Sequence, residues 1–428
     1  MTSPLTNWAG NVTFGMRRFH APTSVTELRQ IVAQADAVRA LGTGHSFNAL
    51  ADTTGDLVST ADLPRTIDID PAARTVTVSG GTRFGTLASA LHGAGYALHN
   101  LGSLPHISIA GACATGTHGS GDTNGNLSSA VRVLHYVDAA GELVTLDRSS
   151  AEFAGSVVAL GALGIVTHLT LDVVPAFDIQ QWVYEGLPTE ILRARFPEVM
   201  SAAYSVSVFT RWRGESVDQV WLRRKVDDDG PVPGPARWHG ATRADKQRHP
   251  VPGMTADACT LQLGISGPSH LRLPHFRLDA APSSRGDEFQ SEYFVAREDA
   301  VAAFDALHDI RKRFAPCLRI SEIRTIAADD LWLSPAHHRD SVAFHFTWLP
   351  DQRAVTAALR HIENALAPFA ARPHWGKLFT LEPDALRALY PAYGPFEQLL
   401  SARDPEGVFR NNLLRRLFAL EAGPKTPN

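Results

Sequence analysis

The hydrophobic pattern of the first third of the chain predicts helices and strands in alternation. A capping box at Ser24 and Glu27 marks the start of a helix that is expected to run to about Ala37. Its apolar positions recur at helical period: Val25, Leu28, Ile31, Val32 and Ala35. The apolar run from Val38 to Leu41 predicts a short strand, which ends in the turn sequence Gly-Thr-Gly-His-Ser-Phe-Asn at residues 42–48.

Short alternating patterns continue to about residue 146. Residues 66–70 and 75–79 alternate between apolar and polar positions on either side of a Pro-Ala-Ala turn, which predicts two strands. A helix is expected from about Arg83 to His92. Residues 131–137 and 142–146 predict a hairpin that turns through Ala140-Gly141.

The pattern changes after about Pro175, and this change predicts a second domain. Strand-like segments such as residues 204–212 and 220–223 are interrupted by a long stretch from Asp227 to Pro250 that is rich in proline, glycine and charge. The chain has 428 residues, more than the roughly 250 to 300 at which a single hydrophobic core stops growing. Two cores are therefore expected, with a sizeable loop in the second domain.

The last third of the chain predicts one helix and two long strands before a helical tail. Apolar residues at helical spacing indicate a helix within residues 297–314, and residues 318–326 and 341–348 indicate strands. The tail from Tyr390 to Phe418 is mostly helical in pattern. We expect an α+β fold with one domain at residues 1–178, a second at 179–380 on a mainly antiparallel sheet with helices, and a segment at 381–428 that returns to pack on the first.

Charge and composition exclude several classes of partner. The formal net charge is -4 at pH 7 without any block of like charges, so neither nucleic acid nor a membrane surface is an expected partner. The N-terminal sequence lacks a basic region followed by an apolar stretch, and no segment reaches the roughly 18 apolar residues of a membrane span. We expect a cytoplasmic protein, either a monomer or a simple homo-oligomer.

The spacing of cysteines and histidines predicts neither a disulfide nor a metal site. Cys113, Cys259 and Cys317 are odd in number, far apart and without CxxC spacing. The 18 histidines include no HExxH motif and no paired His-x-His spacing. Cys113 follows Gly111 inside a glycine-rich tract, where we expect it to be a small buried residue.

Two glycine-rich tracts are the first candidate binding sites. The turn at residues 42–48 sets two glycines around a small residue, and the backbone N–H groups of such a turn can face an anion. The second tract, residues 103–121, is made mostly of small side chains. Residues of this size are not expected to build a core, and their expected role is to let the backbone approach a ligand closely.

In this order, the tracts resemble the FAD-binding domain of the vanillyl-alcohol oxidase flavoprotein superfamily. The resemblance is carried by Gly-Thr-Gly-His-Ser at 42–46, Gly-Gly-Thr-Arg-Phe-Gly at 80–85, the tract at 103–121 and Leu-Gly-Ala-Leu-Gly-Ile-Val at 160–166. It implies a two-domain flavoprotein with an FAD-binding domain and a substrate-binding (cap) domain. The glycines lie in loops and no helix immediately follows the first set, so a GxGxxG dinucleotide fold and a nicotinamide cofactor are not expected.

The same resemblance implies which residues hold FAD. In this family the histidine of the GxGHS turn is bonded covalently to the flavin, which implies attachment through His45. The alternative is a turn histidine that only forms hydrogen bonds. The other positions that match FAD contacts are Gly42, Thr43, Gly44, Ser46, Ser103, Ser108, Gly111, Thr115, Gly116, Thr117, His118, Val166 and His374.

Three later motifs resemble the sugar-oxidising branch of the superfamily, most closely the alditol (xylitol) oxidases. They are Glu-Ile-Arg at 322–324, His-Phe-Thr at 345–347 and His-Trp-Gly-Lys at 374–377. Residues two apart on a strand share a face, so Glu322 and Arg324 are expected to point the same way. From the strand pattern alone, a surface ion pair is the simpler interpretation of these two residues.

The resemblance implies a polyol site and two candidates for the proton acceptor. A carboxylate accepts and a guanidinium donates hydrogen bonds, which suits a substrate with a hydroxyl on every carbon. Either Lys377 or His345 is implied to take the hydroxyl proton, while the alternative for Lys377 is a solvated loop lysine. The residues implied to bind substrate are Ser103, Glu322, Arg324, Thr347 and Lys377.

The function implied is FAD-dependent oxidation of a primary hydroxyl of an alditol such as xylitol or sorbitol to the aldose, with dioxygen reduced to hydrogen peroxide. An aldonolactone oxidase or dehydrogenase and a flavin-binding protein without turnover are the alternatives.

Gly102 matches a position that in relatives lies over the flavin carbon where oxygen reacts, and glycine there leaves the path open. The alternative is that Gly102 only relaxes a turn.

Overall fold

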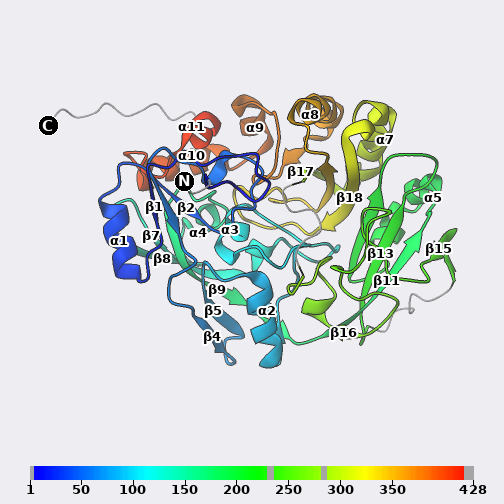
Figure 1. The fold of residues 1–428 in the computed structure, drawn as a ribbon, viewed down its shortest axis with the longest axis horizontal. Coiled ribbons are helices and arrows are strands. Elements are labelled where there is room, and N and C mark those ends of the chain that lie inside the picture. Colours follow the sequence, from blue (N-terminus) through cyan, green and yellow to red (C-terminus); the bar gives the residue numbers. More distant parts are fainter. Residues whose placement is uncertain (1–3, 229–235, 281–286, 419–428) are drawn as a thin grey trace.

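The strands of the described residues are gathered into two large sheets and two small ones (Figure 1). The computed structural model describes residues 4–228, 236–280 and 287–418. Within these residues, one large sheet has five strands and the other has ten. A separate hydrophobic core lies against each large sheet, as the length of the chain predicts.

The five-stranded sheet is antiparallel, with the strand order β4-β5-β9-β7-β8. The predicted hairpin at residues 131–146 is confirmed as the pair β7 and β8. Along β9 every second residue is buried, which is the pattern of a strand with one face on a core. The bounds are β4 Ile67–Asp70, β5 Thr75–Ser79, β7 Val131–Val137, β8 Leu143–Asp147 and β9 Ile165–Asp172.

A small parallel sheet carries the first glycine-rich turn. Its strands are β1 (Arg18–His20), β3 (Asp56–Ser59) and β2 (Val38–Leu41), in that order, and the turn at residues 42–48 follows β2. The helix α1 (Val25–Ala33) is capped by the Ser24 side chain, as predicted. It ends at Ala33 rather than Ala37, because the chain turns toward β2 and the Ala37 carbonyl accepts a hydrogen bond from Asp56 N.

The second glycine-rich tract does contribute to a core, so the opposite expectation was wrong. Its centre is the short helix α3 (Ile109–Ala114), which buries Ile109 and Cys113 in the same core as the five-stranded sheet. Small residues allow this helix to pack closely, since the Ala110 N–H donates to the carbonyl of Gly80. Burial raises the pKa of the Cys113 thiol to about 12, so this cysteine is a packed, unreactive residue.

The ten-stranded sheet is antiparallel throughout and has strands from the middle and the end of the chain. Its order is β14-β15-β11-β13-β12-β18-β19-β17-β20, with β16 pairing to β11. The predicted strands at 318–326 and 341–348 are confirmed as β18 and β19. The bounds are β11 Asp178–Glu185, β12 Ser205–Thr210, β13 Gln219–Lys225, β14 Arg237–Trp238, β15 Ala241–Arg243, β16 Gly267–Pro268, β17 Phe289–Ala296, β18 Leu318–Ile326, β19 Ser341–Trp348 and β20 Arg372–Pro373.

Two helices cover one face of this sheet and leave its other face to a cavity. The helices α7 (Ala300–Ile310) and α8 (Gln352–Leu366) lie side by side over the sheet (Figure 1). They pack on each other and share a hydrophobic core with Phe344 and Phe346 of β19. Side chains alternate along a strand, so the neighbours of these apolar residues point to the opposite face. That opposite face is unusually polar, and it forms part of the site described below.

The helical tail packs against the core of the five-stranded sheet. Phe396 and Leu400 lie in the same hydrophobic core as Leu134 of β7, and Arg403 forms an ion pair with Glu152. The tail helices are α9 Pro383–Leu389, α10 Tyr393–Arg403 and α11 Asn412–Leu417. The remaining elements are β6 Tyr96–Ala97 and β10 Val174–Pro175, which pair, and the helices α2 Phe84–Gly93, α4 Phe153–Ser156, α5 Thr189–Ala194 and α6 Phe196–Met200.

A long segment of mostly irregular structure follows β15. The polar stretch predicted from Asp227 to Pro250 includes residues 229–235, which lie outside the described residues, and the short strands β14 and β15. Residues 244–280 then run over the ten-stranded sheet with β16 as their only strand, and we call them the 244–280 segment. Across the described ranges, no helix is long and apolar enough to cross a membrane.

Candidate active site

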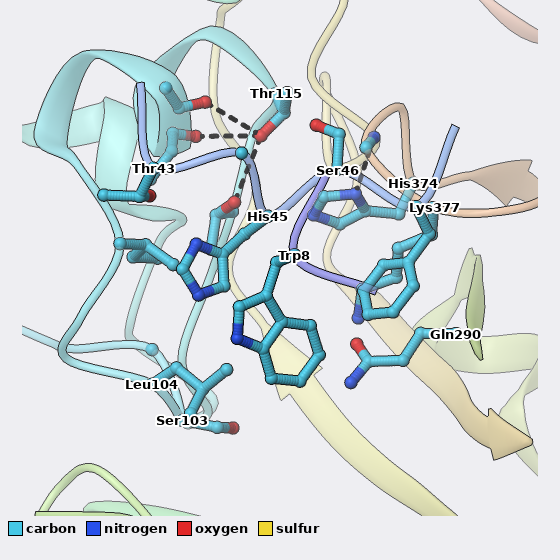
Figure 2. Close-up of a pocket in the computed structure, with 18 of the residues that line it drawn as sticks. Trp8, Thr43, His45, Ser46, Ser103, Leu104, Thr115, Gln290, His374 and Lys377 are labelled. Atoms are coloured by element: carbon cyan, nitrogen blue, oxygen red, sulfur yellow. Dashed lines mark hydrogen bonds between the residues drawn. The ribbon is translucent and has the colours of Figure 1, made fainter. Parts of the chain in front are cut away.

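One large cavity lies between the glycine-rich loops and the polar face of the ten-stranded sheet (Figure 2). Of the candidate FAD-binding, substrate-binding and catalytic residues, Gly116 alone does not line it. Gly116 has a positive φ of 66° and lies against Pro335. The predicted residues that line the cavity are Gly42, Thr43, Gly44, His45, Ser46, Ser103, Ser108, Gly111, Thr115, Thr117, His118, Val166, Glu322, Arg324, His345, Thr347, His374 and Lys377.

The strand register explains why the polar side chains of three strands meet. Glu292 of β17 pairs with His345 of β19, and His345 pairs with Glu322 of β18, so the three residues form one row across the sheet. Thr347 lies two residues along β19 from His345 and shares its face. Glu322 and Arg324 likewise share a face, and both are almost fully buried rather than exposed as a surface ion pair.

Glu292 is the centre of the site, and it was missed in the sequence. Its side chain is 1% exposed and accepts hydrogen bonds from Arg324 Nη2 at 2.6 Å and from Lys377 Nζ at 2.7 Å. His118 Nε2 lies 3.2 Å from the same carboxylate. The available signal was a glutamate within an otherwise apolar strand sequence, Glu-Tyr-Phe-Val-Ala.

Two carboxylates and two cations balance each other in this buried site. Burial by itself raises the pKa of Glu292, but the charges of Lys377 and Arg324 hold it well below its ordinary value. The pKa of Glu322 is lowered in the same way, against the effect of burial, by Arg324 and His275. Both carboxylates are therefore ionised at neutral pH, when they accept hydrogen bonds and do not donate them.

His345 is a neutral imidazole with a free nitrogen beside the cavity. Burial, and then the charge of Lys377, lowers the pKa of His345 well below 6.5. Among the described residues, its Nε2 atom has no hydrogen-bond partner. A neutral ring with an unpaired nitrogen can accept a proton.

The N-terminal segment and residues 374–377 hold the first glycine-rich turn on both sides. The ring of Trp8 stacks on that of His45 at 5.3 Å with an angle of 20° between the planes (Figure 2). Trp8 N donates to Gly44 O at 2.8 Å. Asn48 Nδ2 donates to the carbonyls of Trp375 and Lys377 at 2.8 and 3.0 Å. Hydrogen bonds thus connect the turn that carries His45 to the loop that carries Lys377. The stacking of Trp8 on His45 was not predicted from the sequence.

The chemistry of this half of the cavity fits FAD. The Nδ1 atom of His45 is buried with no partner among the described residues, and burial lowers the pKa of His45 to about 4, so the ring is neutral and nucleophilic. A Cβ atom at Gly42 would collide with Ser108 Oγ, and Gly161 has a φ of 65°. Backbone therefore lines this part of the cavity, as a pyrophosphate requires.

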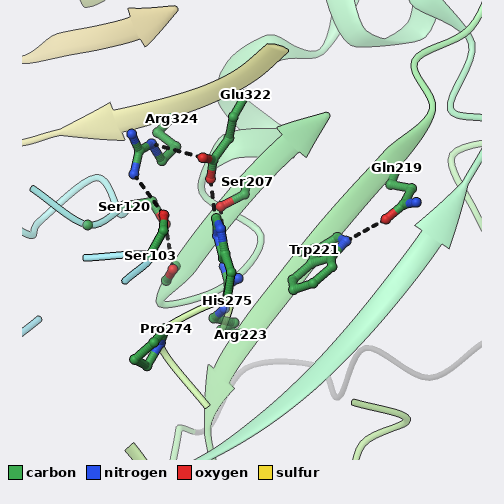
Figure 3. Close-up of polar contacts among 12 residues, drawn as sticks. Ser103, Ser120, Ser207, Gln219, Trp221, Arg223, Pro274, His275, Glu322 and Arg324 are labelled. Atoms are coloured by element: carbon green, nitrogen blue, oxygen red, sulfur yellow. Dashed lines mark hydrogen bonds and ion pairs between the residues drawn. The ribbon is translucent and has the colours of Figure 1, made fainter. Parts of the chain in front are cut away.

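The loop at Gly102 and Ser103 meets the sheet at Arg324. Arg324 Nη1 donates to Ser103 Oγ at 3.5 Å (Figure 3). The φ of Gly102 is not positive, and a Cβ atom at this position would meet its nearest neighbours at 3.6 to 4.0 Å, which is ordinary contact. The turn itself therefore does not require glycine at position 102.

Comparisons with known proteins agree with this geometry. Residues 17–147 match a family model described as an FAD binding domain, and residues 285–417 match one described as D-arabinono-1,4-lactone oxidase. The chain is 47% identical to the alditol oxidase of a Streptomyces species, over 98% of this chain and 100% of that one. It is 29% identical to the L-gulono-1,4-lactone dehydrogenase of Mycobacterium tuberculosis, over 97% and 99% of the two chains.

A solved structure shares the fold. The crystal structure of cholesterol oxidase from B. sterolicum superposes with a TM-score of 0.76 and 16% sequence identity, and the match covers 97% of this chain and 96% of that one. At this level of identity the likeness concerns architecture alone. It agrees with the expected α+β, two-part flavoprotein fold.

Proposed function

Because this chain belongs to the alditol oxidase family and is an FAD-dependent oxidase acting on CH–OH groups, we propose that its substrate is an alditol such as xylitol or sorbitol. A primary hydroxyl is oxidised to the aldehyde of the aldose, and dioxygen is reduced to hydrogen peroxide. The observation that carries the proposal is the buried pair Glu322 and Arg324, which lines the cavity with an acceptor and a donor side by side.

The polyol hydroxyls are held by Ser103, Glu322, Arg324, Thr347 and Lys377. Glu322 is ionised and accepts hydrogen bonds from hydroxyls, while Arg324 and the ammonium of Lys377 donate to hydroxyl oxygens. Burial lowers the pKa of Lys377 below its ordinary value, and the ion pair with Glu292 at 2.7 Å offsets only part of this effect. In the proposal, Lys377 is the ion-paired, charged donor that orients the reacting hydroxyl.

His345 takes the proton of that hydroxyl. Its ring is neutral, its Nε2 atom has no partner among the described residues, and it lies between the two carboxylates of its row. The adjacent ionised groups, Glu292 and Glu322, offset part of the effect of burial and of the Lys377 charge, both of which disfavour the imidazolium that forms. FAD, when bound by the loops of the cavity, would supply the hydride acceptor and the redox partner for dioxygen.

We further propose that residues 1–178 with the segment from 381 form the FAD-binding part of the chain and that residues 179–380 form the substrate-binding part. The contacts of Phe396 and Leu400 with the first core support this division for the described tail. FAD is then held by the loops of the first part, and the ten-stranded sheet faces it with the polyol site.

The proposal is tested by anaerobic titration of the purified yellow protein. Xylitol or sorbitol should bleach the flavin absorbance, because hydride transfer needs no oxygen. Gulono-lactone should bleach it more slowly at the same concentration. Faster bleaching by the lactone would favour an aldonolactone oxidase or dehydrogenase, and failure of every polyol and lactone to bleach it would indicate a flavin-binding protein without turnover.

FAD is expected to be bonded covalently to His45. The support for this is the neutral, unpartnered Nδ1 atom in the turn that matches the covalent histidine of the family. After acid precipitation, the yellow colour should remain with the protein pellet. A His45→Ala variant should bind FAD through the loops alone and release it into the supernatant, whereas His249→Gln, at another histidine lining the cavity, should keep the colour in the pellet. Colour in the wild-type supernatant would rule out the bond.

A side chain at position 102 is expected to slow the reaction with oxygen. Ordinary contacts around a Cβ atom at Gly102 mean that Gly102→Ala should fold without strain, so any effect comes from the space that the side chain fills. In stopped flow, Gly102→Ala and still more Gly102→Val should slow reoxidation by oxygen, while reduction by polyol and reoxidation by an artificial dye change little. If both half-reactions slow together, Gly102 positions the loop instead.

A further inference from the structure

The 244–280 segment brings a histidine to the carboxylate of Glu322. At Pro274–Phe276 its backbone lies on the loop that carries Ser103: His275 N and Phe276 N both donate to the Ser103 carbonyl, at 3.1 and 3.3 Å. On its other side, the His275 carbonyl accepts a hydrogen bond from Thr260 N at 2.9 Å. The backbone of His275 is therefore fixed from two directions.

The side chain of His275 is equally constrained. Its ring lies 5.5 Å from the ring of Phe209 and 5.4 Å from that of Trp221, in edge-on contact with both. The residue is 5% exposed and lines the cavity. In this position its Nε2 atom lies 3.2 Å from Glu322 Oε1 (Figure 3). The His275 ring cannot rotate away from the carboxylate unless Phe209 or Trp221 repacks.

The two oxygens of Glu322 face two different partners. Oε1 faces His275, and Oε2 lies 3.6 Å from Arg324 Nε. Burial lowers the pKa of His275, and the charges of Arg223 and Arg324 add to this effect although Glu322 opposes it. The Nε2–H of a neutral ring in this position faces Oε1, which has no aligned hydrogen-bond partner among the described residues. Without this polar contact, the carboxylate would be free to rotate toward Arg324.

We propose that His275 is a positioning residue that fixes the carboxylate of Glu322 for the hydroxyls of the substrate. The inference rests on the proposed role of Glu322 in binding polyol. Through its backbone the same residue holds the carbonyl of Ser103, so one short stretch of the 244–280 segment orders two of the substrate-binding groups. The segment is thereby part of the active site.

Two substitutions separate the polar contact of His275 with Glu322 from the packing of its ring. His275→Phe keeps a ring between Phe209 and Trp221 and removes the donor, whereas His275→Gln can place an amide N–H where Nε2 was and loses the ring. We expect kcat/KM for xylitol to fall about tenfold or more in His275→Phe. It should stay within about threefold of the wild type in His275→Gln. His270→Gln, a half-buried histidine of the same segment, is the matched control and should behave as the wild type.

A double-mutant cycle shows whether His275 acts through Glu322. In a Glu322→Gln background, His275→Phe should cause little further loss of kcat/KM, because the carboxylate that it positions is already gone. Full additivity of the two losses would overturn the inference, and so would His275→Phe with wild-type kcat/KM. The inference would also be overturned if His275→Gln lost as much kcat/KM as His275→Phe and had a lowered melting temperature. The ring of His275 would then have a structural role. If Glu322→Gln alone leaves kcat/KM unchanged, the proposed role of Glu322 fails instead.

Discussion

Replacing His345 with glutamine is expected to slow reduction of the enzyme by xylitol at least about 100-fold, since a positioned general base contributes roughly 10² to 10⁴ to such a step. The variant keeps a polar side chain in the row between Glu292 and Glu322 but cannot accept the proton. Anaerobic stopped flow at saturating xylitol measures this rate. Lys377→Gln should instead act mainly through weaker binding of polyol, seen as a higher KM.

The pH dependence distinguishes the two candidate bases. The active form of His345 is neutral, and its pKa in the folded protein lies well below 6.5 because of burial and the nearby charge of Lys377. The reduction rate should therefore be level from about pH 6.5 to 8 and should fall only as the pH drops toward that lowered pKa. Lys377 would be the base if the reduction rate rose with pH through this range. Lys377→Gln would then abolish the rise, and His345→Gln would keep it.

Glu322→Gln is expected to lower kcat/KM for alditols by about 10-fold to 150-fold. A hydrogen bond to a charged group contributes about 1.5 to 3 kcal/mol, and the amide has the same size but no charge. The melting temperature should change much less than the activity. Arg324→Ala should lower activity by a comparable factor and also destabilise the fold, because it leaves the buried carboxylate of Glu292 without its partner at 2.6 Å.

The control for this pair is an ion pair on the outside of the molecule. Glu152→Gln breaks the contact of Glu152 with Arg403, whose side chains are 35% and 36% exposed, and should change neither kcat/KM nor the melting temperature noticeably. If Glu322→Gln melts far below the wild type but its folded fraction keeps full specific activity, Glu322 serves the fold. The polyol site would then have to lie elsewhere in the cavity.

Local pattern was enough to predict much of the fold. Strands β18 and β19 follow from their own apolar residues, and the alternation along β18 is what puts Glu322 and Arg324 on one face. The glycine-rich turn at residues 42–48 follows a strand as expected. These features depend on neighbours within about ten residues, which a sequence shows directly.

The residues that were missed depend on contacts between distant parts of the chain. Glu292 becomes the centre of the site only because β17 pairs with β19 in a register that sets it opposite His345, and register is fixed by tertiary packing. His275 lies in a segment with little regular structure, so no periodicity points to it. The sequence does not predict the helix α3, because small side chains argue against a core, whereas in the fold they pack closely within one.

A peroxide assay across substrate classes tests whether this enzyme oxidises alditols with dioxygen. Hydrogen peroxide is measured with purified yellow protein in air, at equal concentrations of xylitol, sorbitol, aldoses, gulono-lactone and simple primary alcohols. The row of acceptors and donors around Glu322 and Arg324 predicts the highest rate with xylitol or sorbitol, and a low rate with simple alcohols that lack further hydroxyls. Peroxide formed fastest from gulono-lactone, or reduction by xylitol without peroxide, would contradict the account.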